Sequence, residues 1–348
     1  MSKKLISFTL AALFVATSLV CADDKKVTRA AFDLGSGTFK VVVAEVNGED
    51  VNVKFSKMIS VGLGNDLAES KDQTLSSRVQ DAAFKALQEL KKDAEKQKAT
   101  EFQGVATEVF RKAKNGEALL TKLTNVANVN LQVISQEKEG MIGFNTAAVL
   151  TPEENKTNLI SWDSGGASFQ IVGTDGQDHY NIYKGALGSA VVLKILMEEV
   201  RKQPYTQEAP INPLSAQECD ALVKALQNKI SAPKWLKNRM KNQDASIVGI
   251  GDSNSMFAHI SKRVGSDHFT IEDVRQAIQD LAGKTDDDFK QEYNVSRPKA
   301  YLTEIVLLYA VMDKFGIHEV TFKEANGSTI GLLIDKEFWK SVVPQTKN

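Results

Sequence analysis

The pattern of hydrophobic and polar positions in the first half of the chain predicts a definite order of strands and helices. Two β-rich runs flank the turn at residues 33–38, which predicts a hairpin, and a third strand is expected over 51–60. Apolar residues recur at helical spacing over 75–99, so an amphipathic helix is expected there. Two further strands, at 102–107 and 131–135, are predicted with a helix between them.

The same pattern begins again after residue 151. Strands are predicted at 158–163, 169–172 and 179–184, and the first two flank a turn at 164–168. The remaining predicted elements are a helix at 190–201, a strand at 246–250, helices at 271–282 and 300–315, and a strand at 319–323. The polar, proline-containing stretch 151–156 is the expected joint between the halves. The chain is therefore predicted to be an α/β protein with two ribonuclease-H-like domains, 23–150 and 151–348, facing each other across a cleft.

The composition is that of an ordinary globular protein and excludes several classes of function. The 348 residues include 43 basic and 44 acidic side chains, a formal net charge of −1. Duplex nucleic acid is therefore not an expected partner, because its binding needs a marked basic excess or patch. The chain has 2 cysteines, Cys21 and Cys219, too few for a zinc ribbon or a disulfide scaffold.

The N-terminus has the pattern of a secretory signal peptide. Lys3 and Lys4 precede an apolar run, and Val20, Cys21 and Ala22 fit a cleavage site after Ala22. The run contains several hydroxyl residues and is short for a stable membrane span. We therefore expect residues 1–22 to be removed and the protein to be periplasmic or secreted. A lipid anchor on Cys21 is the alternative, although Val20 is large for the position before a lipidated cysteine.

Each half contains a glycine-rich turn directly after an aspartate. Glycines let the backbone approach a ligand, and successive N–H groups form a nest for anions. The aspartates Asp33 and Asp163 are expected to hold a divalent cation, directly or through its waters. Two such turns facing across a cleft predict a site that grips a phosphate chain from both sides. The alternative is a pair of ordinary hairpin turns in which each aspartate caps its own turn. The residues expected to cradle phosphate are Gly35, Ser36, Gly37, Thr38, Gly165, Gly166, Ala167 and Ser168.

With these motifs the chain resembles the Ppx/GppA family of exopolyphosphatases and guanosine pentaphosphate phosphohydrolases, within the actin, Hsp70 and sugar-kinase superfamily. The resemblance is carried by residues 31–40, 105–116, 133–140, 162–168, 184–189 and 250–252. It implies a hydrolase that uses Mg²⁺ or a similar cation such as Mn²⁺ and releases phosphate from polyphosphate or a guanosine pentaphosphate-like nucleotide. It implies Glu139 as the general base, and Arg111 and Gly251 as phosphate-binding residues. Homodimers occur among the proteins that it resembles.

The second turn departs from the Ppx/GppA pattern. The family usually has a glutamate where this chain has Gln170, and an arginine where it has Lys40. Residues 165–170, Gly-Gly-Ala-Ser-Phe-Gln, resemble instead the extracytoplasmic apyrases, which hydrolyse nucleoside tri- and diphosphates. Gln170 is therefore expected to position the attacking water. Two alternatives remain open, an apyrase that acts on ATP or ADP and a catalytically weak protein that binds phosphate chains.

Overall fold

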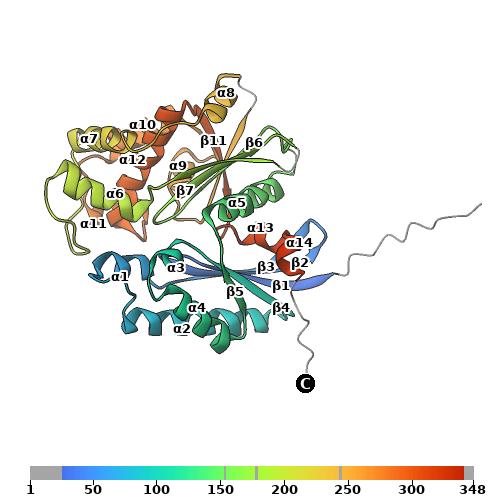
Figure 1. Cartoon of the computed structure of the whole chain (residues 1–348). Coiled ribbons are helices and arrows are strands. Elements are labelled where there is room, and N and C mark those ends of the chain that lie inside the picture. The colour runs from blue at the N-terminus through green and yellow to red at the C-terminus, as the bar shows by residue number, and fades with distance from the viewer. Residues whose placement is uncertain (1–25, 153, 177–178, 243–244, 341–348) are drawn as a thin grey trace, which may run out of the picture.

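The computed structural model describes residues 26–152, 154–176, 179–242 and 245–340, which form two α/β lobes stacked one above the other (Figure 1). The predicted signal peptide lies outside the described residues. The elements of the first lobe are β1 (Val27–Leu34), β2 (Thr38–Asn47), β3 (Asp50–Ser60), α1 (Leu63–Glu69), α2 (Ser77–Lys96), β4 (Glu101–Ala106), α3 (Glu108–Lys112), α4 (Gly116–Ala127), β5 (Asn130–Val133) and α5 (Gln136–Leu150).

The second lobe begins at the strand that was predicted after the joint. Its elements are β6 (Leu159–Ser164), β7 (Phe169–Thr174), β8 (Tyr180–Gly185), α6 (Ser189–Ile195), the π-helix η1 (Leu196–Val200), α7 (Ala216–Gln227), α8 (Lys234–Asn242), β9 (Ser246–Gly251), α9 (Met256–Val264), β10 (His268–Thr270), α10 (Ile271–Leu281), α11 (Asp286–Tyr293), α12 (Pro298–Phe315) and β11 (Glu319–Glu324). Two short helices, α13 (Thr329–Ile334) and α14 (Lys336–Trp339), end the described chain.

The two sheets repeat one topology. The first has the strand order β3-β2-β1-β4-β5, and the second has β8-β7-β6-β9-β11 with β10 added at its edge. In each sheet the first strand pairs antiparallel with the second and parallel with the fourth. The carboxyl ends of β1 and β6, where the glycine-rich turns begin, therefore occupy equivalent places. The predicted α/β fold with two ribonuclease-H-like halves is confirmed.

Each sheet is covered by helices on both faces. Apolar residues of α2 and α4, including Val79, Leu87 and Leu123, pack on one face of the first sheet. In the second lobe α12 is buried along most of its length and forms the centre of the largest core cluster. Cys219 of α7 belongs to that cluster as a buried free thiol. No helix in the described ranges is long and apolar enough to cross a membrane.

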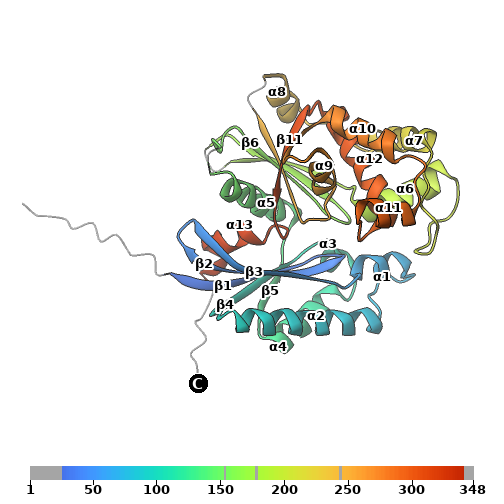
Figure 2. The same ribbon diagram turned by 180° about the vertical axis from the view of Figure 1, so that it is seen from behind.

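The helices α5 and α13 lie between the two sheets (Figure 2). Phe144 and Ala147 of α5 pack with Val172 and Ile250 of the second sheet. Helices α13 and α14 return to the first sheet, where buried residues of both lobes form one cluster, Ala31, Val42, Ala44, Val46, Val105, Ile134, Ile142, Leu332, Leu333, Phe338 and Trp339. The end of the chain thus packs on the N-terminal lobe, although the rest of residues 151–340 forms the other one.

Candidate active site

The two glycine-rich turns have the same internal hydrogen bond. The N–H of Gly35 donates to the carbonyl oxygen of Thr38 at 3.0 Å, and the N–H of Gly165 donates to that of Ser168 at 2.9 Å. Each turn is also held by the start of the next helix. The amide of Gly64 donates to the Ser36 carbonyl at 2.7 Å in the first lobe. The corresponding bond of the second lobe, from the Ala190 amide to the Gly166 carbonyl, is 2.9 Å long.

This anchoring through carbonyl oxygens leaves amides at both turns available. In the described residues of the two turns, the amides of Ser36, Gly37, Gly166 and Ala167 donate none of the backbone hydrogen bonds that hold the turns. Adjacent unpaired amides suit the oxygens of a phosphate group. Ser168 differs from the other turn residues because its side chain is buried. The geometry therefore supports a backbone cradle at each turn more directly than hydroxyl contacts from Ser168.

Asp33 and Asp163 both lie near Lys40, which occupies β2 opposite Asp33. Burial raises the pKa of Asp33, the Lys40 ammonium opposes this shift, and the charge of Asp163 adds to it. Burial likewise raises the pKa of Asp163, whose carboxylate Oδ2 accepts a hydrogen bond of 2.9 Å from Ser328. The two predicted cation ligands thus share one electrostatic environment, with a lysine between them.

Glu139 reaches the same place from the first turn of α5. Ser135 caps this helix by accepting a hydrogen bond from the Lys138 amide at 3.2 Å, and so sets where the helix begins. Burial, followed by repulsion from Asp33, raises the pKa of Glu139 to about 8. Arg111 opposes the shift and donates to Glu139 Oε2 at 3.2 Å. A partly buried carboxyl with a raised pKa beside two aspartates has the properties of a general base.

Arg111 is therefore not a solvent-facing arginine at the end of α3. Its guanidinium donates to the Ile134 carbonyl at 2.5 Å as well as to Glu139, and the side chain is 24% exposed. The remaining donors of its planar fork are available for a phosphate oxygen. The structure thus brings Arg111 together with the predicted base, through an ion pair that links α3 to α5.

Gln170 is buried in β7, directly across the strand pair from Asp163. Its Nε2 lies 3.5 Å from Ser168 Oγ. Helix α5 approaches both positions closely because it has glycines there. A β-carbon on Gly140 would lie 3.4 Å from Gln170 Cβ, and one on Gly143 would lie 3.6 Å from Asp163 Oδ2. Glu139, Asp163 and Gln170 are therefore neighbours across one helix-on-sheet contact.

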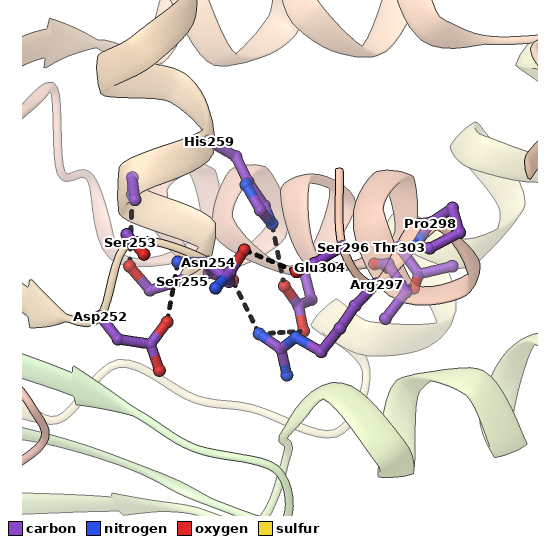
Figure 3. Close-up of polar contacts among 12 residues, drawn as sticks. Asp252, Ser253, Asn254, Ser255, His259, Ser296, Arg297, Pro298, Thr303 and Glu304 are labelled. Carbon is purple, nitrogen blue, oxygen red and sulfur yellow. Dashed lines mark hydrogen bonds and ion pairs between the residues drawn. The ribbon is translucent and has the colours of Figure 1, made fainter. Parts of the chain in front are cut away.

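The loop after β9 borders the site with Asp252, whose charge contributes to the raised pKa of Asp163. Asp252 Oδ1 accepts a hydrogen bond of 2.7 Å from the Asn254 amide. On its other side the loop is held by Arg297, which donates to the Asn254 carbonyl at 2.7 Å, and by Ser296 (Figure 3). Gly251 ends β9, and its carbonyl accepts from the Ala325 amide at 2.8 Å. Its predicted contact with phosphate remains a prediction.

Two parts of the site were not identified from the sequence. One is the position of Lys40 between the aspartates, since the chain pattern placed it only on a strand. The other is the segment after β11, residues 325–331, which contributes Ser328. No sequence motif singles out this serine, because it lies 165 residues from Asp163 and its contact arises only from folding.

The donor set fits a divalent cation that is shared with the substrate. Burial is the largest cause of the raised pKa values of Asp33, Asp163 and Glu139, so a bound cation would stabilise their charged forms. In the described part of the chain no group of three His, Cys, Asp or Glu side chains forms a closed metal site. Magnesium is commonly bound by one or two carboxylates and completes its shell with water and phosphate oxygens. Asp33 and Asp163 would hold the cation in this way.

The repeated sheets, with carboxylates between them, define an α/β protein of two lobes with an actin- and Hsp70-like fold. The family model of the "Ppx/GppA phosphatase family" matches residues 41–337. The chain belongs to this family, as the motifs of its sequence predicted. Membership also confirms the expectation of a hydrolase that acts on phosphoanhydrides.

Solved structures with low sequence identity share the fold, and a curated relative matches the sequence. An Aquifex aeolicus member of the Ppx/GppA family superimposes with a TM-score of 0.69 at 16% identity, covering 92% of this chain and 100% of that one. An exopolyphosphatase from Cytophaga hutchinsonii gives 0.67 at 12% identity, with 88% and 96% covered. The bifunctional 3-dehydroquinate synthase/phosphatase of Fusobacterium nucleatum subsp. nucleatum is 19% identical over 328 residues. That match covers 88% of this chain, which spans only 46% of the relative.

Proposed function

We propose that this protein is an exported, cation-dependent hydrolase that releases terminal phosphate from polyphosphate or from a guanosine pentaphosphate-like nucleotide. The observation that carries the proposal is the meeting of Glu139 with Asp33 and Asp163 between the two backbone cradles. Each half of the fold contributes one cradle and one aspartate. A phosphate chain has negatively charged oxygens on all sides, so the backbone amides of both halves can bind it at the same time.

The proposed reaction begins with the terminal phosphate between the two turns. The amides of Ser36, Gly37, Gly166 and Ala167 bind its oxygens, and Gln170 orients a water molecule. The water oxygen attacks the terminal phosphorus while its proton passes to a carboxylate oxygen of Glu139. The bond from phosphorus to the bridging oxygen breaks, and that oxygen stays with the shortened chain. Arg111 holds Glu139 and contacts the phosphate.

A bound Mg²⁺ or Mn²⁺ supplies positive charge that neutralises phosphate oxygens in this reaction. Replacing Asp33 or Asp163 by asparagine removes one anionic ligand but keeps its size. Each variant is therefore expected to need a higher cation concentration for half-maximal phosphate release. If both titrations coincide with that of the wild type, the aspartates only cap their turns.

A nucleotide substrate is favoured over a bare phosphate chain by one specific observation. A pocket of about 380 Å³ lies beside the loop after β9. It is lined by Asn254, His259, Lys262, Arg263, Tyr293, Asn294, Val295 and Tyr301. Aromatic rings, amides and two cations together suit a nucleobase with its sugar and inner phosphates. The apyrase alternative, hydrolysis of ATP or ADP, also draws on this pocket and on the buried neutral side chain of Gln170.

The deciding experiment compares phosphate release from polyphosphate, guanosine pentaphosphate, ATP and ADP, each with Mg²⁺, Mn²⁺ or Ca²⁺. Glu139→Gln serves as the inactive control under every condition. Tyr293→Leu removes one aromatic ring from the pocket and is expected to lower kcat/KM for nucleotides but not for polyphosphate. Equal effects on both substrates would exclude a base-binding role for the pocket. No release from any substrate would leave binding of phosphate chains as the alternative.

A further inference from the structure

Residues 325–331, which run from the end of β11 into the first turn of α13, contact the aspartates of both halves of the site. Its Asn326 side chain donates to the Lys57 carbonyl of β3 at 3.1 Å, and its Ala325 amide donates to Gly251 of β9. The segment thus touches strands of both sheets. Its conformation depends on Gly327, which has a left-handed φ of 66° that glycine adopts without strain.

Gly327 lies against the first half of the site. A β-carbon placed on it would lie 2.8 Å from Asp33 Oδ2 and 2.9 Å from Lys40 Nζ. The backbone here is therefore in contact with both members of the Asp33–Lys40 pair. Any larger residue would displace one of them, because such short approaches do not occur between real atoms.

Ser328 lies against the second half. Its hydroxyl donates to Asp163 Oδ2 at 2.9 Å, and the residue is 7% exposed. Its carbonyl accepts from the Thr146 hydroxyl of α5 at 3.2 Å, and the same hydroxyl accepts from the Gly331 amide at 2.8 Å. Ser328 is therefore fixed on one side by α5, the helix that carries Glu139, and on the other by the aspartate that it holds.

We propose that Ser328 is a positioning residue, whose hydroxyl fixes the orientation of Asp163 toward Asp33 and Lys40 across the cleft. This inference rests on the proposed phosphohydrolase function. The geometry assigns the serine no contact with the reacting atoms, and its effect passes through the carboxylate. Without the hydroxyl, Asp163 keeps its place on β6 but loses the hydrogen bond that Ser328 donates to its Oδ2.

The test uses Ser328→Ala with Thr329→Val as the matched control. Thr329 is the next residue, is fully buried, and donates its hydroxyl to the Asn326 carbonyl at 2.8 Å without touching a carboxylate. Both variants remove a buried hydroxyl from the same segment. Ser328→Thr keeps a hydroxyl at the position and serves as the conservative variant.

Ser328→Ala is expected to lower kcat about 10- to 100-fold, the range for losing a hydrogen bond to a charged group, with a smaller change in KM. It is also expected to weaken Mg²⁺ binding, measured without turnover by calorimetry in the presence of orthophosphate. Thr329→Val should keep both properties within about threefold, and Ser328→Thr should recover most of the loss. Melting temperatures of all variants show whether each is folded.

Equal losses of kcat and Mg²⁺ affinity in Ser328→Ala and Thr329→Val would overturn the proposal, because they indicate a structural role of the segment alone. Unchanged kcat and Mg²⁺ affinity in Ser328→Ala would overturn it as well. If the wild type releases no phosphate from any substrate, the proposed function fails. The Mg²⁺ titrations then still decide the role of Ser328, since they do not depend on catalysis.

Discussion

Lys40 and Gln170 occupy equivalent positions in the two halves of the fold. Lys40 lies opposite Asp33 on the β1–β2 hairpin, and Gln170 lies opposite Asp163 on the β6–β7 hairpin. The repeat therefore places a cation beside one aspartate and a neutral amide beside the other. Of these two residues only Lys40 is charged, and its ammonium acts to lower the pKa of both Asp33 and Asp163.

Changing Gln170 tests the neutral member of this pair. Gln170→Glu adds a buried carboxylate opposite Asp163, so we expect a shifted cation dependence and a changed preference between polyphosphate and ATP. Gln170→Ala removes the water-orienting amide, so we expect mainly a lower kcat. Both variants are compared over a Mg²⁺ series. Unchanged rates and cation curves for both would mean that Gln170 does not face the reacting water.

Removing the charge of Lys40 tests the cationic member. Lys40→Met keeps the aliphatic stem, but the pKa values of Asp33 and Asp163 should rise further without the ammonium. We expect kcat/KM at neutral pH to fall, because both carboxylates lose the positive charge that lowers their pKa values. Lys40→Arg is the control that keeps the charge. Equal activity of the methionine variant and the wild type would contradict the shared electrostatic role.

The raised pKa of Glu139, about 8, predicts a pH dependence with a defined sign. The base must be ionised, so kcat at low Mg²⁺ should rise with pH up to about 8. Added cation should shift this rise in kcat to lower pH. Glu139→Gln should lower kcat by about 10²–10⁴-fold at every pH. A folded glutamine variant with near wild-type turnover would remove Glu139 from the mechanism.

The same shift has a consequence for stability. A carboxyl whose pKa rises on folding stabilises the protein fully below its ordinary value of 4.5, and this contribution is lost as pH rises through 8. With a chelator present, the wild type should lose up to about 5 kcal/mol more than Glu139→Gln between these pH values. Urea unfolding of both proteins at each pH measures the difference, and parallel curves would contradict the pKa shift.

Leu333 tests whether the end of the chain stabilises the first lobe. It is fully buried in the cluster that α13 shares with β1 and β2. Leu333→Ala is expected to reduce the free energy of unfolding by about 2–5 kcal/mol. Val126→Ala is the control, because Val126 is 54% exposed and its loss should cost little. Similar unfolding curves for the two variants would show that α13 is not a structural part of that lobe.

Cys219 should be inert in the folded protein. Burial raises the pKa of its thiol to about 12, so almost no thiolate forms at neutral pH. A thiol reagent is expected to modify Cys219 only after denaturation. Mass spectrometry of a Cys21→Ser variant, before and after urea treatment, makes the measurement on Cys219 alone. Rapid modification under native conditions would contradict the buried environment.

Local patterns in the sequence determined the repeated order of elements, the two turns with their aspartates, and the place of Glu139 at the start of a helix. These features depend on neighbours a few residues away: short runs of apolar residues form the strands, glycines allow the turns, and Ser135 caps α5. The family resemblance then supplied the roles of Glu139 and Arg111 as expectations, and the structure brought both side chains together.

Tertiary structure alone decided how the two halves meet. The position of Lys40 between two aspartates, the return of α13 and α14 to the first sheet, and the contact of Ser328 with Asp163 join residues far apart in the chain. Such contacts arise when the two sheets pack around α5 and α13, so no local sequence pattern predicts them. The sequence therefore determined which groups each half contributes. The packing of the two lobes against each other decided which carboxylates lie close enough to affect one another's pKa.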